Sequence, residues 1–150
     1  MQISEVMKSD DVLIDVSISS KPKLLKFVAE TAAARLGVAA EEILGALQGR
    51  EELGSTGIGA GIAIPHAPVK SISAPFILLI RLAKPIDFEA VDEEPVDIVC
   101  PILTPQGDQG HYLKLLSQIA RQLRLPDAIK AIRSGADQET IYRAFVECDG

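Results

Sequence analysis

The segment that most constrains the fold is Phe76–Leu82, FILLIRL, in which six of seven residues are apolar. An almost continuous apolar run of this length is typical of a β-strand that is covered on both faces. A second strand is predicted over Val96–Leu103, where Pro101 cannot donate a ladder hydrogen bond and so demotes part of the strand to an edge or bulge. Such strands are expected in the interior of a layered domain.

Helical periodicity alternates with these strands. After a short strand over Val12–Val16, Ser20 is the predicted cap of a helix that has Pro22 in its first turn and ends at Gly37. Further helices, with their inward-facing residues, are predicted over Ala40–Glu51 (Ile43, Leu44, Leu47), after a cap at Asp108 (Leu113, Leu116, Ile119, Ala120, Leu123), over Pro126–Arg133 before Gly135, and after a cap at Asp137 (Ile141, Ala144, Phe145). The alternation predicts a single α/β domain over residues 1–150.

The charge balance excludes several classes of function. With 15 basic and 21 acidic residues the net charge is −6, which argues against nucleic acid as the main partner. No basic segment leads into an apolar stretch at the start, and no apolar run approaches the roughly 18 residues of a membrane helix. Cys100 and Cys148 form no CxxC pair, so reduced thiols are expected. We therefore expect a cytoplasmic protein without a membrane segment.

A glycine-rich stretch interrupts the chain between the second helix and the apolar strands. Four glycines fall between Gly54 and Gly61, a density that no helix survives. The stretch is predicted to be a loop that ends in a short strand over Ile62–Ile64, closed by Pro65. It matches neither GxxxxGK[ST] nor GxGxxG, so neither nucleotide-binding fingerprint is present.

The chain has two histidines, and both lie where chemistry is feasible. His66 follows the short strand and a proline at the mouth of a loop, and His111 lies about three residues into a helix. Neutral imidazole is a nucleophile at pH 7, and a phosphoryl acceptor also needs groups that receive about −1.5 to −2 charges. Arg50 continues the inner stripe of its helix and would supply a fixed positive charge. The glycines would allow close approach of the phosphate.

Each of these residues also has a structural interpretation. A histidine is often only structural or exposed, an arginine at a helix end usually complements the helix dipole, and Ser55 and Thr56 are ordinary turn residues that would otherwise supply hydroxyl donors. Cys100 is expected to be a small core residue, and residues 92–94 a solvated turn. Composition and spacing alone leave phosphoryl chemistry as one reading among several.

Longer motifs carry a resemblance to a known family. The stretch STGIGAGIAIPHA, residues 55–67, resembles the active-site signature of the fructose/mannitol-type enzyme IIA domains of the bacterial phosphotransferase system. The run from Arg50 to His66 is most similar to the nitrogen-regulatory branch of these domains. PIDFEAVDEEPVDIVCPILTP, residues 85–105, and HYLKLLSQIARQL, residues 111–123, extend the resemblance over essentially the whole chain.

The resemblance implies a fold, an activity and roles for single residues. It implies a mixed, mostly parallel central sheet flanked by helices on both faces. It implies that His66 accepts a phosphoryl group from a histidine phosphocarrier protein, through Nε2, while a backbone carbonyl holds Nδ1. His111 would position the phosphoryl group, Arg50 would assist, and Ser55 and Thr56 would contact the phosphate. No metal and no cofactor is implied.

Two departures from the family pattern lie near these residues, and several roles stay open. Ala67 and Pro68 replace the glycine that usually follows the histidine, which predicts a stiffer, extended chain there, and Tyr112 replaces the leucine after the helix histidine. The downstream partner would be a regulatory target, in a nitrogen or metabolic control role, or the IIB domain of a fructose- or mannitol-type permease. A regulatory binding module that is never phosphorylated and a metal site at His66 and His111 are the alternatives.

Overall fold

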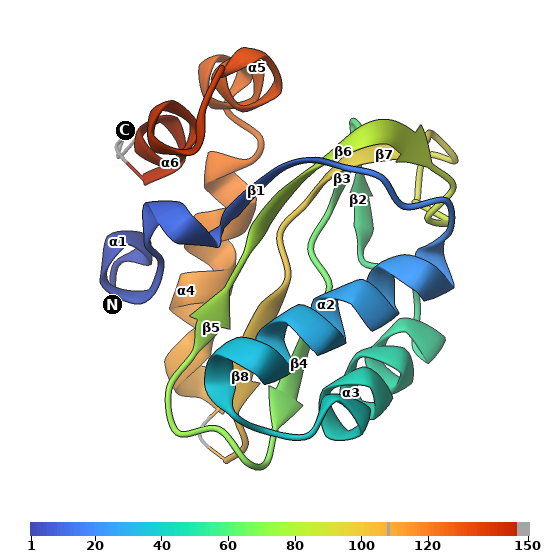
Figure 1. Cartoon of the computed structure of the whole chain (residues 1–150), viewed down its shortest axis with the longest axis vertical. Helices are drawn as coiled ribbons and strands as arrows, with labels where there is room; N and C mark the ends of the chain where they lie inside the picture. Colours follow the sequence, from blue (N-terminus) through green and yellow to red (C-terminus); the bar gives the residue numbers. More distant parts are fainter. Residues whose placement is uncertain (108, 147–150) are drawn as a thin grey trace.

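The computed structural model describes residues 1–107 and 109–146. Its helices and strands are, in chain order, α1 Ile3–Val6, the short 3-10 turn η1 Ser9–Asp11, β1 Val12–Val16, α2 Lys21–Leu36, α3 Ala40–Glu52, β2 Gly57–Gly59, β3 Ile62–Ala63, β4 His66–Val69, β5 Phe76–Ile77, β6 Leu79–Ile86, β7 Val96–Val99, β8 Ile102–Pro105, α4 Gln109–Gln122, α5 Pro126–Ser134 and α6 Gln138–Val146. Figure 1 shows their arrangement.

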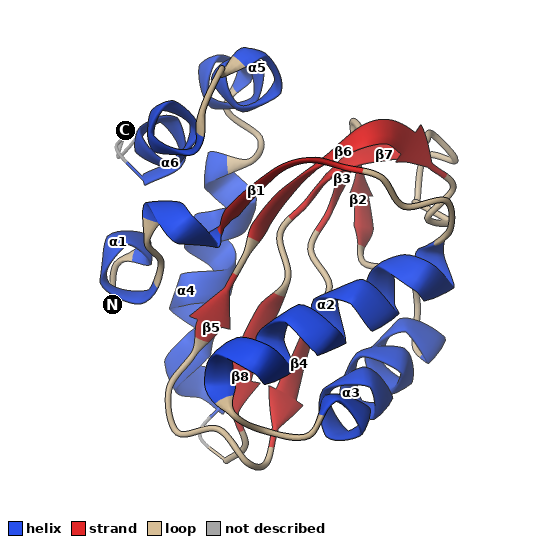
Figure 2. Cartoon of the chain, viewed as in Figure 1, coloured by secondary structure: helices blue, strands red, loops and turns tan. Residues whose placement is uncertain are grey.

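The chain forms one α/β domain, as predicted, with its strands in two sheets. The larger sheet has the order β1-β6-β7-β3-β2 and the smaller has the order β4-β8-β5. Within the described residues, three strand pairs are parallel and three are antiparallel, so the sheets are mixed with no excess of parallel pairs. Figure 2 shows the strands between two groups of helices.

Helices cover both faces of the sheets. On one face, α2 and α3 pack on the larger core cluster, which includes Leu24, Val28, Leu47, Ile80 and Phe88. On the other face, α4, α5, α6 and α1 enclose a second cluster that includes Leu79, Ile98 and Phe145. Both faces of the first half of β6 are therefore covered, which is the environment that its apolar sequence requires.

Both apolar segments predicted as single strands are divided in the structure. The first splits at Leu78, so that β5 lies in the small sheet and β6 in the large one, and the second splits at Cys100 and Pro101. Leu78 N–H donates to the Pro101 carbonyl at 3.1 Å, so the two breaks lie side by side. Pro101 was expected to make part of one strand an edge or bulge, and it lies instead at a break between two strands, whereas nothing in the apolar run indicated the break at Leu78.

The predicted helix ends are largely confirmed, because capping is local. Ser20 accepts from the Lys23 N–H at 3.3 Å, Gly37 ends α2 with φ 70°, and Asp137 accepts from the Thr140 N–H at 2.8 Å. The last bond lowers the pKa of Asp137. The predicted cap at Asp108 lies outside the described residues.

One part of the predicted inner stripe of α4 is wrong. Leu113 is 63% exposed, while Leu115, Ile119 and Leu123 are buried. The buried side of α4 therefore includes Leu115, which was not predicted, and is rotated away from Leu113. None of the helices in the described residues is both long and apolar enough to span a bilayer.

Part of the glycine-rich stretch is a hairpin, where a loop was predicted. β2 pairs antiparallel with β3, and the Gly59↔Ile62 pair closes a turn in which Ala60 and Gly61 have φ of 58° and 81°. Two consecutive positive φ values are the signature of a tight hairpin turn. Asp92 accepts from the Ala60 N–H at 3.0 Å, and this bond is the main cause of its lowered pKa.

Candidate functional site

His66 lies where the chain crosses from the larger sheet to the smaller one. It is the first residue of β4, directly after Pro65, and its side chain is half-buried. Its Nδ1 lies 2.8 Å from the carbonyl oxygen of Ile64. Because a carbonyl only accepts, this contact requires the proton on Nδ1 and leaves the lone pair on Nε2. The predicted contact between Nδ1 and a backbone carbonyl is thus present.

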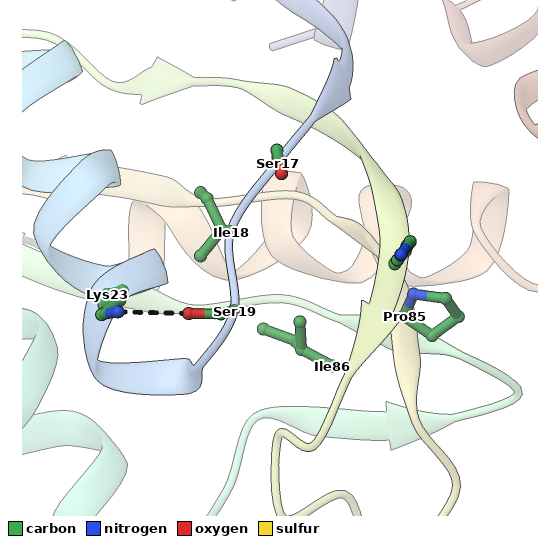
Figure 3. A pocket seen from close by; sticks show the side chains of 7 residues that line it. Ser17, Ile18, Ser19, Lys23, Pro85 and Ile86 are labelled. Atoms are coloured by element: carbon green, nitrogen blue, oxygen red, sulfur yellow. Dashed lines mark hydrogen bonds between the residues drawn. The ribbon is translucent and has the colours of Figure 1, made fainter.

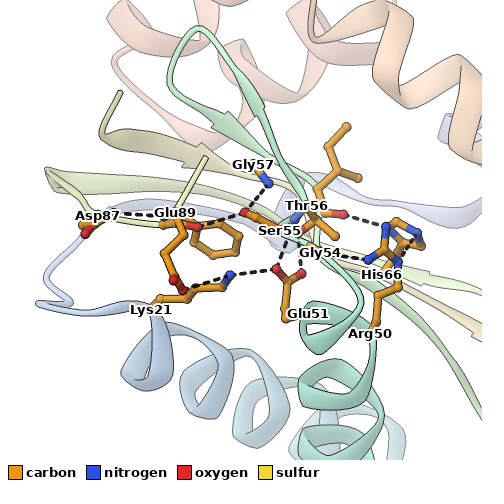
Figure 4. A network of polar contacts seen from close by, with 12 residues as sticks. Lys21, Arg50, Glu51, Gly54, Ser55, Thr56, Gly57, His66, Asp87 and Glu89 are labelled. Atoms are coloured by element: carbon orange, nitrogen blue, oxygen red, sulfur yellow. Dashed lines mark hydrogen bonds and ion pairs between the residues drawn. The ribbon is translucent and has the colours of Figure 1, made fainter. Parts of the chain in front are cut away.

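Arg50 contacts the other side of the same ring. It lies in the last turn of α3 and is half-buried, and its Nε donates to His66 Nε2 over 3.4 Å. Its Nη1 donates to the Gly54 carbonyl at 2.9 Å, as Figure 4 shows. One guanidinium therefore links the imidazole to the start of the glycine-rich stretch.

These groups open into a small cavity of about 190 Å³. It is lined by Arg50, Ser55, Thr56, Ile58, Ile64, His66, Leu116 and Ala120. Four of the five predicted site residues are therefore brought together, with apolar residues of β2 and α4 on the remaining walls. A cavity of this size suits a small group such as a phosphoryl.

The hydroxyls of Ser55 and Thr56 donate away from the imidazole. Ser55 Oγ donates to the Phe88 carbonyl at 2.9 Å and accepts from the Gly57 N–H at 3.0 Å. Thr56 is 4% exposed, and its hydroxyl donates to the carboxylate of Glu51. Both side chains fix the shape of the stretch in this structure, so their expected contact with a phosphate stays a prediction.

Two charged residues of the site were missed by the sequence analysis. Glu51 accepts from the Thr56 backbone N–H at 3.0 Å as well as from its hydroxyl. Lys21 Nζ lies 2.9 Å from Glu51 Oε1, and both side chains are almost buried. Glu51 looks like an ordinary solvated charge at a helix end, and Lys21 is far from it in the chain. No local pattern links them.

His111 does not line the cavity. It is the third residue of α4, it is exposed, and its ring lies edge-on to Tyr112 with the centroids 4.9 Å apart. Successive helical residues are about 100° apart, so His111 lies about 140° around the helix from Leu116 and about 180° from Ala120. Tyr112 is four residues before Leu116 and shares its row. The expected positioning role of His111 is not tested by this geometry and stays a prediction.

The chain after His66 is a strand, where a loop was expected. β4 pairs parallel with β8, with Ala67 opposite Leu103, and Ala67 is 2% exposed. Pro68 has no N–H to donate and is exposed. The extended backbone predicted from the Ala67–Pro68 pair is confirmed, and the alanine fits because its small side chain is buried.

A larger pocket of about 490 Å³ lies elsewhere, where β1 ends and β6 continues. Figure 3 shows its lining, including Ser19, which accepts from Lys23 Nζ at 3.2 Å. It contains no histidine or cysteine, so the smaller cavity holds the more reactive group. Cys100 is a core residue as predicted, with its pKa raised by burial. In residues 1–107 and 109–146, no group of three or more His, Cys, Asp or Glu side chains is arranged to hold a metal ion.

Comparison with known proteins gives consistent matches over nearly the whole chain. The family described as "Phosphoenolpyruvate-dependent sugar phosphotransferase system, EIIA 2" matches residues 5–148. A nitrogen regulatory protein of Bradyrhizobium diazoefficiens is 37% identical over 142 residues, which are 95% of this chain and 93% of that protein.

Solved structures extend the comparison to the fold. The nitrogen regulatory protein IIA-Ntr of Neisseria meningitidis has a TM-score of 0.90 at 25% identity, over 95% of this chain and 98% of that one. The mannitol enzyme IIA of Escherichia coli, solved in complex with phosphorylated enzyme IIB, has a TM-score of 0.79 at 14% identity, over 94% and 97% of the two chains. The second likeness concerns the fold alone.

Proposed function

This chain belongs to the EIIA type 2 family of the phosphoenolpyruvate-dependent sugar phosphotransferase system, and we propose that it is a regulatory phosphoryl carrier that is phosphorylated on Nε2 of His66. The donor is a histidine phosphocarrier protein. The observation that carries the proposal is the bond between Nδ1 and the Ile64 carbonyl, which leaves the lone pair of Nε2 toward Arg50 and the cavity.

The transfer step needs no proton acceptor. The Nε2 lone pair attacks the phosphorus of the carrier's phosphohistidine, and the carrier's P–N bond breaks with its electron pair returning to the carrier's ring nitrogen. One P–N bond replaces another, and the proton stays on Nδ1, hydrogen-bonded to the Ile64 carbonyl, throughout. Catalysis then consists of positioning and charge stabilisation, as in other phosphoryl transfers.

Arg50 supplies the charge stabilisation. Its Nε contacts the lone pair that must attack, so the guanidinium has to shift from Nε2 to the phosphoryl oxygens as the phosphorus arrives. An arginine presents several donors in a planar fork, which suits three equatorial oxygens. His111 lies outside the residues that line the cavity, where α4 contributes Leu116 and Ala120, so the proposed step assigns it no contact.

The role after phosphorylation is regulatory. Support comes from the relatives named nitrogen regulatory proteins, whose similarity covers nearly the whole chain. The new dianion beside Arg50 changes the charge of the surface around the cavity, and thereby the choice of protein partner. A relay to a permease IIB domain is the alternative, because the Escherichia coli mannitol enzyme IIA of the same fold was solved in complex with phosphorylated IIB.

The test is phosphorylation in vitro. The protein is incubated with phosphoenolpyruvate, the general phosphotransfer enzyme and the histidine phosphocarrier protein, and the adduct is detected by intact-protein mass spectrometry. We expect one acid-labile phosphoryl group on the wild type and on the His111→Ala control, and none on His66→Ala. Absence of the adduct on the wild type, or its persistence in His66→Ala, would contradict the proposal.

A second arm distinguishes the two roles. The phosphorylated protein is mixed with fructose- and mannitol-type IIB domains, and phosphoryl loss from His66 is followed. We expect the label to stay on the protein for a regulatory carrier. Rapid transfer to a IIB domain would favour the relay and contradict the regulatory role.

A further inference from the structure

Glu51 is a nearly buried carboxylate at the edge of a cavity that we expect to receive a dianion. Its side chain is 6% exposed, although it lies in the last turn of α3, directly after Arg50. It accepts both the N–H and the hydroxyl proton of Thr56, a residue that lines the cavity. Figure 4 shows the carboxylate between Lys21 and Thr56. One carboxylate therefore fixes the backbone of the glycine-rich stretch beside His66.

Lys21 is the counter-ion of this carboxylate. Its Nζ lies 2.9 Å from Glu51 Oε1 and 4.4 Å from the centroid of the Phe88 ring, with 11% of its side chain exposed. A second carboxylate, Glu89, lies at 3.7 Å but is 77% exposed, so solvent screens it. Lys21 is thus paired with Glu51, although it is the first residue of α2 and lies far before Glu51 in the sequence.

Stability alone does not explain an ion pair in this place. Removing two charges from water costs about as much as their attraction returns, and apolar replacements are often neutral or stabilising. A lone carboxylate at this position would repel an incoming phosphoryl group, whereas a carboxylate neutralised by Lys21 would not. Among the described residues that line the cavity, Arg50 is the one with a fixed charge, and α4 contributes the apolar residues Leu116 and Ala120.

We propose that Glu51 and Lys21 are a positioning pair for phosphoryl acceptance, with two separate tasks. Glu51 holds Thr56, and with it the stretch that forms one wall of the cavity. Lys21 cancels the charge of Glu51, so that the carboxylate holds this wall without opposing the phosphoryl dianion on His66. This inference rests on the proposed function, because its second task requires that His66 carry the phosphoryl group.

The two tasks predict opposite effects on one equilibrium. The ratio of phosphoryl group on this protein to that on the carrier is measured after mixing the phosphorylated carrier with each variant. Lys21→Met leaves the negative charge of Glu51 uncompensated and should lower this ratio about three- to tenfold. This is the size of the repulsion between one unit charge and a phosphoryl group roughly 10 Å away in an effective dielectric of several tens. Glu51→Gln leaves Lys21 uncompensated and should raise the ratio by a similar factor.

Rates and a double variant complete the design. Both single variants should slow the transfer, because each loosens the hold on Thr56, while the double variant Lys21→Met/Glu51→Gln should return the equilibrium to within about twofold of the wild type. Lys21→Arg keeps the charge and should leave the equilibrium unchanged.

Arg143→Met is the matched control, since it breaks an exposed ion pair on α6, between Arg143 and Glu139. Urea unfolding shows which variants are folded. If Lys21→Met unfolds, the rise expected for Glu51→Gln still tests the inference, and if Glu51→Gln unfolds, the recovery of the double variant relative to Lys21→Met does so.

A purely structural role would move both single variants in the same direction, because both would loosen the same wall. Equal shifts, or no shift beyond that of Arg143→Met, would overturn the inference while the wild type still accepts a phosphoryl group. A wild type that accepts none overturns the proposed function, and this inference with it.

Discussion

Replacement of Arg50 is the sharpest test of how the cavity works. The structure gives the guanidinium two contacts, with His66 Nε2 at 3.4 Å and with the Gly54 carbonyl at 2.9 Å. Arg50→Met removes both. Gly54 is exposed, so water replaces the lost donor and the free energy of unfolding should fall by about 1 kcal/mol or less. Loss of one positioned donor from a reacting centre typically costs 10²–10³ in rate, and we expect a reduction of about that size in phosphoryl transfer.

Arg50→Lys separates charge from geometry. The ammonium keeps the positive charge but cannot bond Gly54 and a phosphoryl group through one planar fork, so its rate should lie between those of Arg50→Met and the wild type, roughly tenfold below the latter. The assay is single-turnover transfer from phosphorylated carrier protein, stopped by quenching in base, in parallel with urea unfolding. Arg143→Met serves as the control for loss of one positive charge. Transfer by Arg50→Met within about threefold of the wild type would refute the reasoning.

Four further predictions concern other residues of the fold. His111→Ala should transfer within about threefold of the wild type, whereas Tyr112→Phe, on the row of α4 that leads to the cavity, should be the slower of the two in the same quenched assay. Gly57→Ala should lower the free energy of unfolding by about 1–3 kcal/mol, because a Cβ there would lie 2.8 Å from a buried side-chain atom of the β6–β7 connection. Gly49→Ala, in open space on α3, should raise it by about 0.5–1 kcal/mol in the same urea titration. The bonds from Thr140 lower the pKa of Asp137. The ionised carboxylate therefore stabilises the fold above pH about 4, and this contribution is lost as the pH falls below that value. The difference in free energy of unfolding between the wild type and Asp137→Asn should shrink between pH 6 and pH 2.5.

The features that were predicted best from the sequence are those that depend on residues close together in the chain. The Ser20 cap and the Gly37 stop follow from bonds that span three or four residues, and both are confirmed. The grouping of Arg50 with His66 was expected from the family motif that contains both residues and from the positive charge that a phosphoryl acceptor needs. The split of the first apolar run at Leu78 was not, since its two halves find their partners in separate sheets through long-range pairing.

The residues that sequence missed at the site are those with long-range roles. Glu51 belongs to a run of charges at a helix end, where a solvated side chain is the usual outcome. The two bonds from Thr56 and the approach of Lys21 from α2 together make a buried position tolerable. The positioning role expected of His111 stays a prediction, and this residue too depends on long-range packing. Its place near a helix start was read correctly, but its side of the helix depends on which row packs against the sheets, and the predicted row was rotated toward the exposed Leu113.

The division of the strands into two sheets explains why the reactive imidazole lies where it does. The chain passes from one sheet to the other three times, at Pro65, at Leu78 and at Pro101. Two hydrogen bonds connect these breaks: Leu78 N–H donates to the Pro101 carbonyl, and Ile102 N–H donates to the Pro65 carbonyl at 2.8 Å. A residue in the middle of a ladder gives its carbonyl to the neighbouring strand. At the break, Ile64 lies between β3 and β4, and its carbonyl accepts from the His66 ring instead. The break that interrupts the sheet thus sets the tautomer of His66, and a strand continuous from residue 62 to residue 69 would remove the acceptor on which the proposed Nε2 chemistry depends.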